Sequence, residues 1–129
     1  MDMKLSEEQL QLQEGARRFM DEECTLAFVR EMEADKLGFS RTMWRQMAEL
    51  GWLGIDLPSA HGGLALGVLD LAILMRELGR HLCPSPFLST AVIAGEAIAR
   101  AGSEEQRRRY LEPLVGGDLV LAFAYRSEE

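Results

Sequence analysis

Cysteine, positive charge and long apolar runs are all scarce in this chain of 129 residues. Its two cysteines, Cys24 and Cys83, stand far apart and form no CxxC pair, so the sequence predicts neither a disulfide framework nor a zinc site. No segment reaches the roughly 18 uninterrupted apolar residues of a membrane-spanning helix. The first residues are polar and acidic rather than basic and then apolar, which argues against a secretion signal.

The formal net charge of −7 argues against binding to nucleic acids or anionic membranes, because both require clustered positive charge. An apolar content of 47% over 129 residues is enough for one domain with a core of its own, but not for two. We therefore expect one compact unit that works in the cytoplasm, with no nucleic-acid partner and no membrane partner.

Local start and stop signals predict an all-α chain of about six helices. Ser6 and Ser103 each stand three residues before a glutamine, which is the pattern of a capping box, and Ser40 and Ser85 are placed to cap two further helices. Gly51 and Gly102 follow the last apolar position of a helix, where a helix commonly ends. The expected helices cover residues 6–24, 25–35, 41–50, 68–80, 86–101 and 103–113.

Residues 51–67 carry no helical period and contain several glycines and large apolar side chains, so we expect an extended loop packed beneath other elements. Eight of the eleven residues from 68 to 78 are apolar, which predicts a central helix buried on most sides. Glu77 stands three residues before Arg80, as in an exposed ion pair of little energetic weight.

Residues 119–125, of sequence LVLAFAY, predict a buried strand after the helices. A single strand leaves its backbone donors and acceptors unpaired on both sides. We therefore expect either a sheet-containing domain beyond this point or a partner chain that completes the strand. On this basis residues 1–118 form a helical domain, and residues 119–129 begin a β-domain.

No residue of this chain is identified as catalytic or metal-binding by its spacing. His61 and His81 lack further ligands at zinc-site spacings, and the glycines form neither a dinucleotide fingerprint nor a phosphate loop. Ser59, Ser85 and Ser89 lack the surroundings of a nucleophile elbow. The arginines at 107–109 fan out around a helix and indicate a solvated face.

Several segments together resemble the N-terminal helical domain of acyl-CoA dehydrogenases. They are GWLGIDLP at 51–58, HGG at 61–63, RELGR at 76–80, GSEEQRRRYL at 102–111 and LVGGDL at 114–119, followed by the expected strand. The resemblance covers nearly the whole chain, in the family's order and spacing. It implies an oxidoreductase, a flavoprotein of fatty acid metabolism, whose middle β-domain and C-terminal helical domain are absent from this sequence.

In that family a carboxylate from a C-terminal segment removes the α-proton of an acyl-CoA, and the β-hydrogen leaves as a hydride to FAD. The resemblance therefore implies an enzyme as the full-length protein, whereas the fragment alone should be inactive and bind FAD weakly or not at all. It also implies acyl-CoA as substrate, an electron-transfer flavoprotein or similar acceptor as partner, and a homo- or hetero-oligomer.

The resemblance assigns two groups of residues. The cofactor-binding residues of the terminal strand would be Phe123, Tyr125, Arg126 and Ser127. Many relatives carry a hydrophobic-Thr-Glu-Pro motif there, and this chain instead has YRSE at 125–128, so the hydroxyl contact to the flavin is altered. The substrate-binding residues, at the start of the fifth helix, would be Ser85, Pro86, Ser89, Thr90 and Ile93.

Two alternatives stay open. The apolar residues of 87–93 are equally well explained as the core of a helix bundle as by an acyl pocket. The chain itself is either the N-terminal domain of a dehydrogenase or a non-catalytic helical subunit or interaction module of the same fold, completed by strand addition from a partner. The identity of the acyl group is not encoded in these residues.

Overall fold

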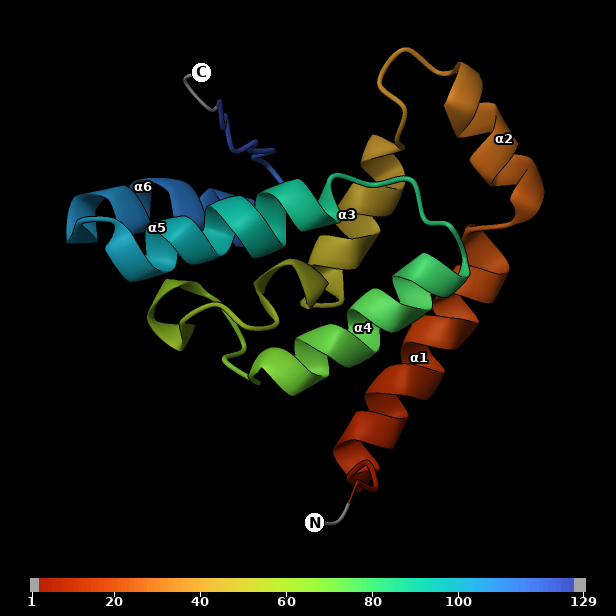
Figure 1. Ribbon diagram of the computed structural model, residues 1–129, viewed down its shortest axis with the longest axis horizontal. Helices are drawn as coiled ribbons and strands as arrows, with labels where there is room; N and C mark the ends of the chain where they lie inside the picture. Colours follow the sequence, from red (N-terminus) through yellow and green to blue (C-terminus); the bar gives the residue numbers. More distant parts are fainter. Residues whose placement is uncertain (1–2, 127–129) are drawn as a thin grey trace. The chain divides into compact units, whose positions relative to one another are not determined.

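The computed structural model describes residues 3–126, and their secondary structure is helical (Figure 1). The α-helices are α1 (Glu7–Glu23), α2 (Leu26–Ala34), α3 (Arg41–Glu49), α4 (Val68–Arg80), α5 (Gly95–Ala101) and α6 (Glu104–Val115). Two 3₁₀ turns, η1 (Trp52–Gly54) and η2 (Ser59–His61), and one π-helix, η3 (Leu88–Ala94), complete the series. The prediction of an all-α chain with six helices is confirmed.

The chain divides into two compact units instead of the single unit expected from its composition. One unit contains the residues up to Ser40 together with Leu66–Pro84, and the other contains Arg41–Ala65 together with the residues from Ser85 onward. The division follows from which helices pair: α4 lies beside α1, whereas α6 lies against α5, η1 and η2. Composition sets how much core is possible but does not say how that core is partitioned.

Side-chain caps start α1 and α6 as the sequence predicts, and a further cap starts α2. No side-chain cap hydrogen bond starts η3, so the prediction that Ser85 caps that helix is wrong. Ser6 accepts from the Gln9 amide at 3.2 Å while the Gln9 side chain accepts from the Ser6 amide at 3.0 Å, and Ser103 and Gln106 repeat this at α6. Thr25 caps α2 through the Phe28 amide. These bonds satisfy amides that have no partner inside a helix.

Helix α4 has the predicted bounds but not the predicted burial. Its buried residues lie on one broad face, whereas Val68 is 73% exposed and Leu69 is also exposed. The apolar content of a helix counts the residues that can be buried, and the neighbouring elements decide which of them are. The prediction of burial on most sides is therefore wrong.

Glu77 lies on the buried face of α4 and is fully buried, which corrects its prediction as an exposed partner of Arg80. The Arg17 guanidinium of α1 donates to both of its carboxylate oxygens, from Nη2 at 2.9 Å and from Nε at 3.3 Å. This hydrogen bonding holds the pKa of Glu77 below its usual range even though burial acts in the opposite direction. A bidentate ion pair therefore ties α1 to α4.

The second unit is built on the loop that the sequence predicts to be buried. Trp52, Leu53, Ile55 and Leu57 are all buried, and Gly51 ends the preceding helix with φ of +80°. Gly63 passes so close to Leu57 that a Cβ there would lie 2.1 Å from the Leu57 carbonyl oxygen. Only glycine therefore allows this loop to close on itself.

The segment predicted as one α-helix over 86–101 is a π-helix, η3, followed by α5. At their junction the Gly95 amide donates to the carbonyls of Thr90 and Val92, and the bond to Thr90 spans five residues. A Cβ on Gly95 would lie 3.3 Å from the Thr90 carbonyl oxygen, so glycine suits this close approach. Hydrophobic spacing does not reveal a turn with an extra residue.

The predicted buried strand at 119–125 is not formed within residues 3–126. Residues 119–126 are irregular, Phe123 is 58% exposed and Tyr125 is 81% exposed. Their described part makes no backbone–backbone hydrogen bond. A strand requires a neighbouring strand for its ladder, and the described residues offer none.

Replacing Arg17 with Met leaves the Glu77 carboxylate buried without its partner. We expect the melting temperature, measured by circular dichroism, to fall by about 5–10 °C. The control is Arg18→Met on the exposed side of the same helix, which should change the melting temperature by less than about 2 °C. Equal shifts in the two variants would contradict the proposed weight of the Arg17–Glu77 pair.

The same substitution at two glycines should have opposite effects. Gly63→Ala forces a methyl group against the Leu57 carbonyl and should cost about 3 kcal/mol or more of unfolding free energy. Gly15→Ala lies within α1, where nothing is within 4 Å of the new methyl group, and should stabilise by about 0.5–1 kcal/mol. Urea unfolding measures both, and a mild effect at Gly63 would show that the loop can open without cost.

Candidate functional site

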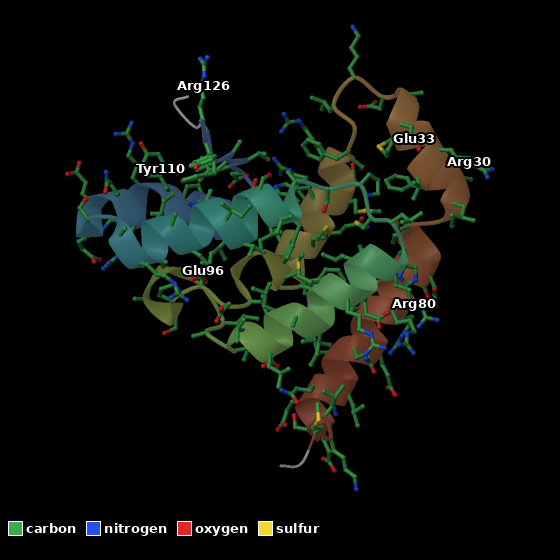
Figure 2. The ribbon with its side chains drawn as sticks, viewed as in Figure 1. Arg30, Glu33, Arg80, Glu96, Tyr110 and Arg126 are labelled. Carbon is green, nitrogen blue, oxygen red and sulfur yellow. The ribbon has the colours of Figure 1, made fainter. Side chains whose placement is uncertain are left out.

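An open groove of about 520 Å³ lies in the second unit, between the helical hairpin of α5 and α6 and the terminal segment, residues 119–126. It is lined by Ala94, Ala97, Ile98, Ala101, Gly102, Gln106, Tyr110, Leu121, Ala122 and Phe123. Small residues recur along the α5 side, while Tyr110 and Phe123 supply the large surfaces. Figure 2 shows Tyr110 on α6.

The groove is suited to apolar contact rather than to acid–base chemistry. Its lining contains no ionisable side chain apart from the Tyr110 phenol, and its one amide side chain is Gln106. General acid–base catalysis requires a titratable group within hydrogen-bond reach of the reacting atoms. These ten residues can therefore shape and dry a binding site for an apolar group.

A buried hydroxyl attaches the terminal segment to the wall of this groove. Thr90 is fully buried in η3, and its Oγ1 donates to the Leu121 carbonyl at 2.7 Å and accepts from the Leu121 amide at 3.0 Å. Leu121 itself lines the groove. One side chain thus satisfies both backbone groups of one residue in a segment that has no strand partner.

The five residues predicted to bind substrate lie around η3, and none of them lines the groove. Ser85 and Pro86 are half-buried just before η3. Ser89 donates its hydroxyl to the Pro86 carbonyl at 3.1 Å. The Thr90 hydroxyl is hydrogen-bonded to the backbone of Leu121, whereas the Ile93 side chain is exposed. Of these five, Ile93 is the one whose side chain is exposed.

The residues predicted to bind the cofactor lie on the terminal segment. Phe123 lines the groove, Tyr125 is largely exposed, and the Arg126 side chain points away from α5 and α6 (Figure 2). Ser127 lies outside the described residues. The Thr90–Leu121 contact brings the two predicted groups together, although they are about thirty residues apart in sequence.

Gln106 and Tyr110 are the lining residues that sequence reasoning missed. They stand four apart on α6, and a helical spacing alone does not say which neighbour that face meets. Small side chains form the α5 side of the groove, where Ala94, Ala97 and Ala101 belong to the lining.

His61 is buried at the end of η2, where it faces two carboxylates of α6. Its Nε2 lies 3.6 Å from Glu104 Oε1 and its Nδ1 lies 3.7 Å from Glu112 Oε1, both too long for a hydrogen bond. Within residues 3–126 no group of three or more His, Cys, Asp or Glu side chains is arranged to hold a metal ion. The position of His61 beside Glu104 and Glu112 is where η2 meets α6.

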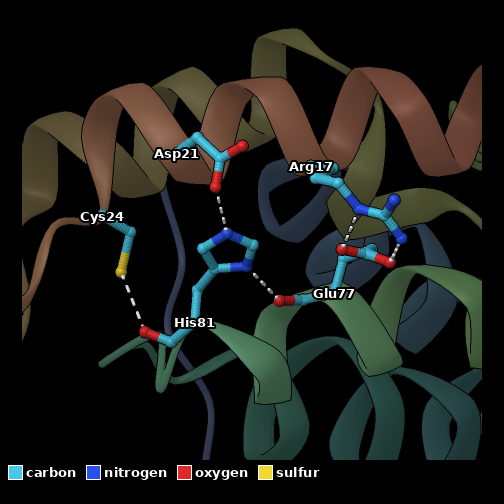
Figure 3. Close-up of polar contacts among 5 residues, drawn as sticks. All are labelled: Arg17, Asp21, Cys24, Glu77 and His81. Carbon is cyan, nitrogen blue, oxygen red and sulfur yellow. Dashed lines mark hydrogen bonds and ion pairs between the residues drawn. The ribbon is translucent and has the colours of Figure 1, made fainter.

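A polar cluster in the first unit surrounds His81 (Figure 3). Its Nε2 lies 2.8 Å from Asp21 Oδ1 and its Nδ1 lies 2.8 Å from the Glu77 carbonyl oxygen. Both partners are acceptors, so the imidazolium, which donates from both nitrogens, fits them best. Burial lowers the pKa of His81, but these hydrogen bonds and the charges of Asp21 and Glu77 outweigh it and raise the pKa overall.

Cys24 closes the same cluster. Its thiol donates to the His81 carbonyl at 3.6 Å, and burial raises its pKa by more than a hydrogen bond with Cys83 lowers it (Figure 3). A raised pKa keeps the thiol protonated, which is the less nucleophilic form. The cluster therefore connects α1 to the end of α4.

Comparison with known sequences identifies the family. Residues 6–118 match the family model for the acyl-CoA dehydrogenase N-terminal domain. The chain belongs to the acyl-CoA dehydrogenase family. The match runs from the capping serine of α1 to the residue before the terminal segment, so the resemblance of the sequence to this family is confirmed.

One curated relative and two solved structures illustrate the similarity. Acyl-CoA dehydrogenase FadE27 of Mycobacterium tuberculosis is 33% identical over 109 residues, which cover 84% of this chain and 29% of FadE27. A variant of the Tcur3481-Tcur3483 steroid ACAD is 39% identical, with a TM-score of 0.83, over 90% of this chain and 32% of that one. The ChsE4-ChsE5 complex from Mycobacterium tuberculosis matches at 31% identity and a TM-score of 0.86, over 95% of this chain and 34% of that one.

This acyl-CoA dehydrogenase family member therefore spans about a third or less of the length of these proteins. The residues of this chain that match the family model, 6–118, are those that contain its helices. None of the helices within residues 3–126 has both the length and the apolar character needed to cross a bilayer.

The raised pKa of His81 gives this family member a pH dependence with a definite sign. A histidine whose pKa is raised in the folded state stabilises the fold fully at pH values below its unfolded-state pKa of about 6.5. This stabilisation is lost as the pH rises through the folded-state pKa. Asp21→Asn should therefore lower the unfolding free energy at pH 5.5 more than at pH 9, by about 1 kcal/mol. Urea unfolding at both pH values measures this, with Glu22→Gln as the exposed control on α1. A loss that is equal at both values would contradict the role of His81.

Proposed function

We propose that this chain is the N-terminal domain of a flavin-dependent acyl-CoA dehydrogenase. In this proposal residues 1–118 form the helical domain and residues 119–129 begin the first strand of a middle β-domain. The observation that carries the proposal is the terminal segment, whose described backbone has no strand partner and which exposes Val120, Phe123 and Tyr125. Family membership over residues 6–118 supports it as well.

The reaction of the full protein is the α,β-dehydrogenation of an acyl-CoA thioester. FAD supplies the hydride acceptor when bound. The groove lining contains no carboxylate to act as base, so this domain contributes binding surface and the base lies elsewhere. The isolated chain is accordingly inactive and binds FAD weakly or not at all.

The terminal segment fits one side of a flavin site. Phe123 presents an exposed ring at the groove, and the backbone groups beyond Leu121 make no backbone–backbone hydrogen bonds within the described residues. An exposed ring and free amides match a planar aromatic ligand that carries carbonyl oxygens. We assign to this side of the site Phe123, Tyr125, Arg126 and Ser127.

The start of η3 forms one wall of the acyl pocket. Ser85, Pro86, Ser89, Thr90 and Ile93 belong to this wall. Because the Thr90 and Ser89 hydroxyls are already bonded within the chain, the wall offers the acyl group mainly apolar surface, with Ile93 the most exposed of the five. Such a wall excludes water from the thioester.

We infer the partners from the family and the compartment from the acidic composition. The substrate is an acyl-CoA, the electron acceptor is an electron-transfer flavoprotein or a similar carrier, and the protein works in the cytoplasm as a homo- or hetero-oligomer. The similar structures include a steroid ACAD and a two-protein complex, which supports a bulky acyl group and a hetero-oligomeric assembly.

A second candidate is a non-catalytic helical subunit or interaction module of the same fold. The exposed terminal segment favours it too, because a partner chain can complete an unpaired strand. In this case the partner supplies the sheet, and the complex has no need of a flavin.

Flavin reduction tests the proposal. The 129-residue chain and a protein that also carries the middle and C-terminal domains are each mixed with FAD and an acyl-CoA, and the flavin absorbance is followed. We expect bleaching only with the added domains, because the groove of this chain contains no base. Turnover by the chain alone would overturn our assignment of the chemistry to other domains. A stable complex that never retains FAD would support the second candidate.

A further inference from the structure

Thr90 occupies an unusual position for a residue expected to touch substrate. It lies in the middle of the π-helix η3, is fully buried, and directs its hydroxyl at the backbone of Leu121. A hydroxyl has one donor hydrogen and acceptor lone pairs, and Thr90 uses both functions on a single residue. With its donor hydrogen used and its side chain fully buried, the hydroxyl is not available to a ligand's polar group.

The two bonds to Leu121 imitate the pairing of neighbouring strands. In an antiparallel pair one residue exchanges both an N–H and a C=O bond with the residue opposite, and Thr90 provides the same two contacts from a side chain. The next residues, Ala122 and Phe123, lie on the lining of the groove. Leu121 and Phe123 both line the groove, so fixing the Leu121 backbone restricts where the Phe123 ring, two residues later, can lie.

The π-helix holds Thr90 in this position. The Gly95 amide donates to the Thr90 carbonyl across the wide turn, and a Cβ on residue 95 would lie 3.3 Å from this carbonyl oxygen, a close contact that glycine avoids. The backbone of Thr90 is thus held by η3 while its side chain holds the terminal segment. Single wide turns of this kind are frequent at functional sites.

We propose that Thr90 is a positioning residue that sets the register of residues 119–126 against η3 and thereby places Phe123 for contact with the flavin. This inference rests on the proposed function, in which the terminal segment forms one side of the flavin site. It changes the role of Thr90 from a contact with the acyl group to a link between the acyl wall and the flavin side.

The first test measures the register alone. Thr90→Val keeps the shape of the side chain and removes both hydrogen bonds, so amide hydrogen exchange in peptides covering 119–126 of the complete protein should become about tenfold faster or more. Thr90→Ser retains the hydroxyl and should exchange like the wild type. Thr42→Val makes the same chemical change at an exposed position of α3 and serves as the control. Unchanged exchange in Thr90→Val overturns the proposal.

The second test measures the consequence for the flavin. FAD affinity of the complete protein, followed by flavin fluorescence, should fall about tenfold or more in Thr90→Val and recover in Thr90→Ser. Faster exchange with unchanged FAD affinity would overturn the link between register and flavin. A wild-type protein that takes up no FAD overturns the proposed function and, with it, the flavin half of this inference, while the exchange rates still decide the register.

Leu121→Pro provides an independent variant if Thr90→Val fails to fold. Proline at position 121 has no N–H to donate to the Thr90 hydroxyl, and the substitution leaves the sequence of η3 unaltered. Exchange at residues 122–126 should rise and FAD affinity should fall, as in Thr90→Val. Wild-type values for both in a folded Leu121→Pro protein would overturn the proposal.

Discussion

One buried polar side chain in each unit is hydrogen-bonded to a residue far away in the sequence, and the positions of the elements that it joins depend on this contact. Glu77 reaches Arg17 across sixty residues, and Thr90 reaches Leu121 across thirty-one. An unpaired buried carboxylate or hydroxyl costs far more than a paired one gains, so each contact admits few alternative arrangements. The first contact ties α1 to α4, and the second ties the terminal segment to η3.

Features of the fold with local causes were predictable from the sequence. The capping boxes at Ser6 and Ser103, the left-handed Gly51 and the buried loop after it follow from interactions within a few residues. Features with distant causes were not. The division into two units, the burial of Glu77 and the absence of a strand at 119–126 depend on which elements meet, and local spacing carries no record of that.

The candidate site shows the same division. The resemblance to the family was enough to predict Phe123 of the terminal segment, which lines the groove. Gln106 and Tyr110 were missed because the face of α6 that meets α5 is set by packing. The double bond of Thr90 to Leu121 was also missed, because a threonine in a helix gives no signal of the backbone it will meet.

The interleaving of the two units has a consequence for how the molecule assembles. The partners α1 and α4 are separated by all of α3 and the loop after it, so their association must close a long stretch of chain before it gains any contact. Closures of this kind slow folding, because their entropic cost precedes their stabilisation. During synthesis on the ribosome, α1 can therefore pack against α4 only after α4 has emerged from the exit tunnel.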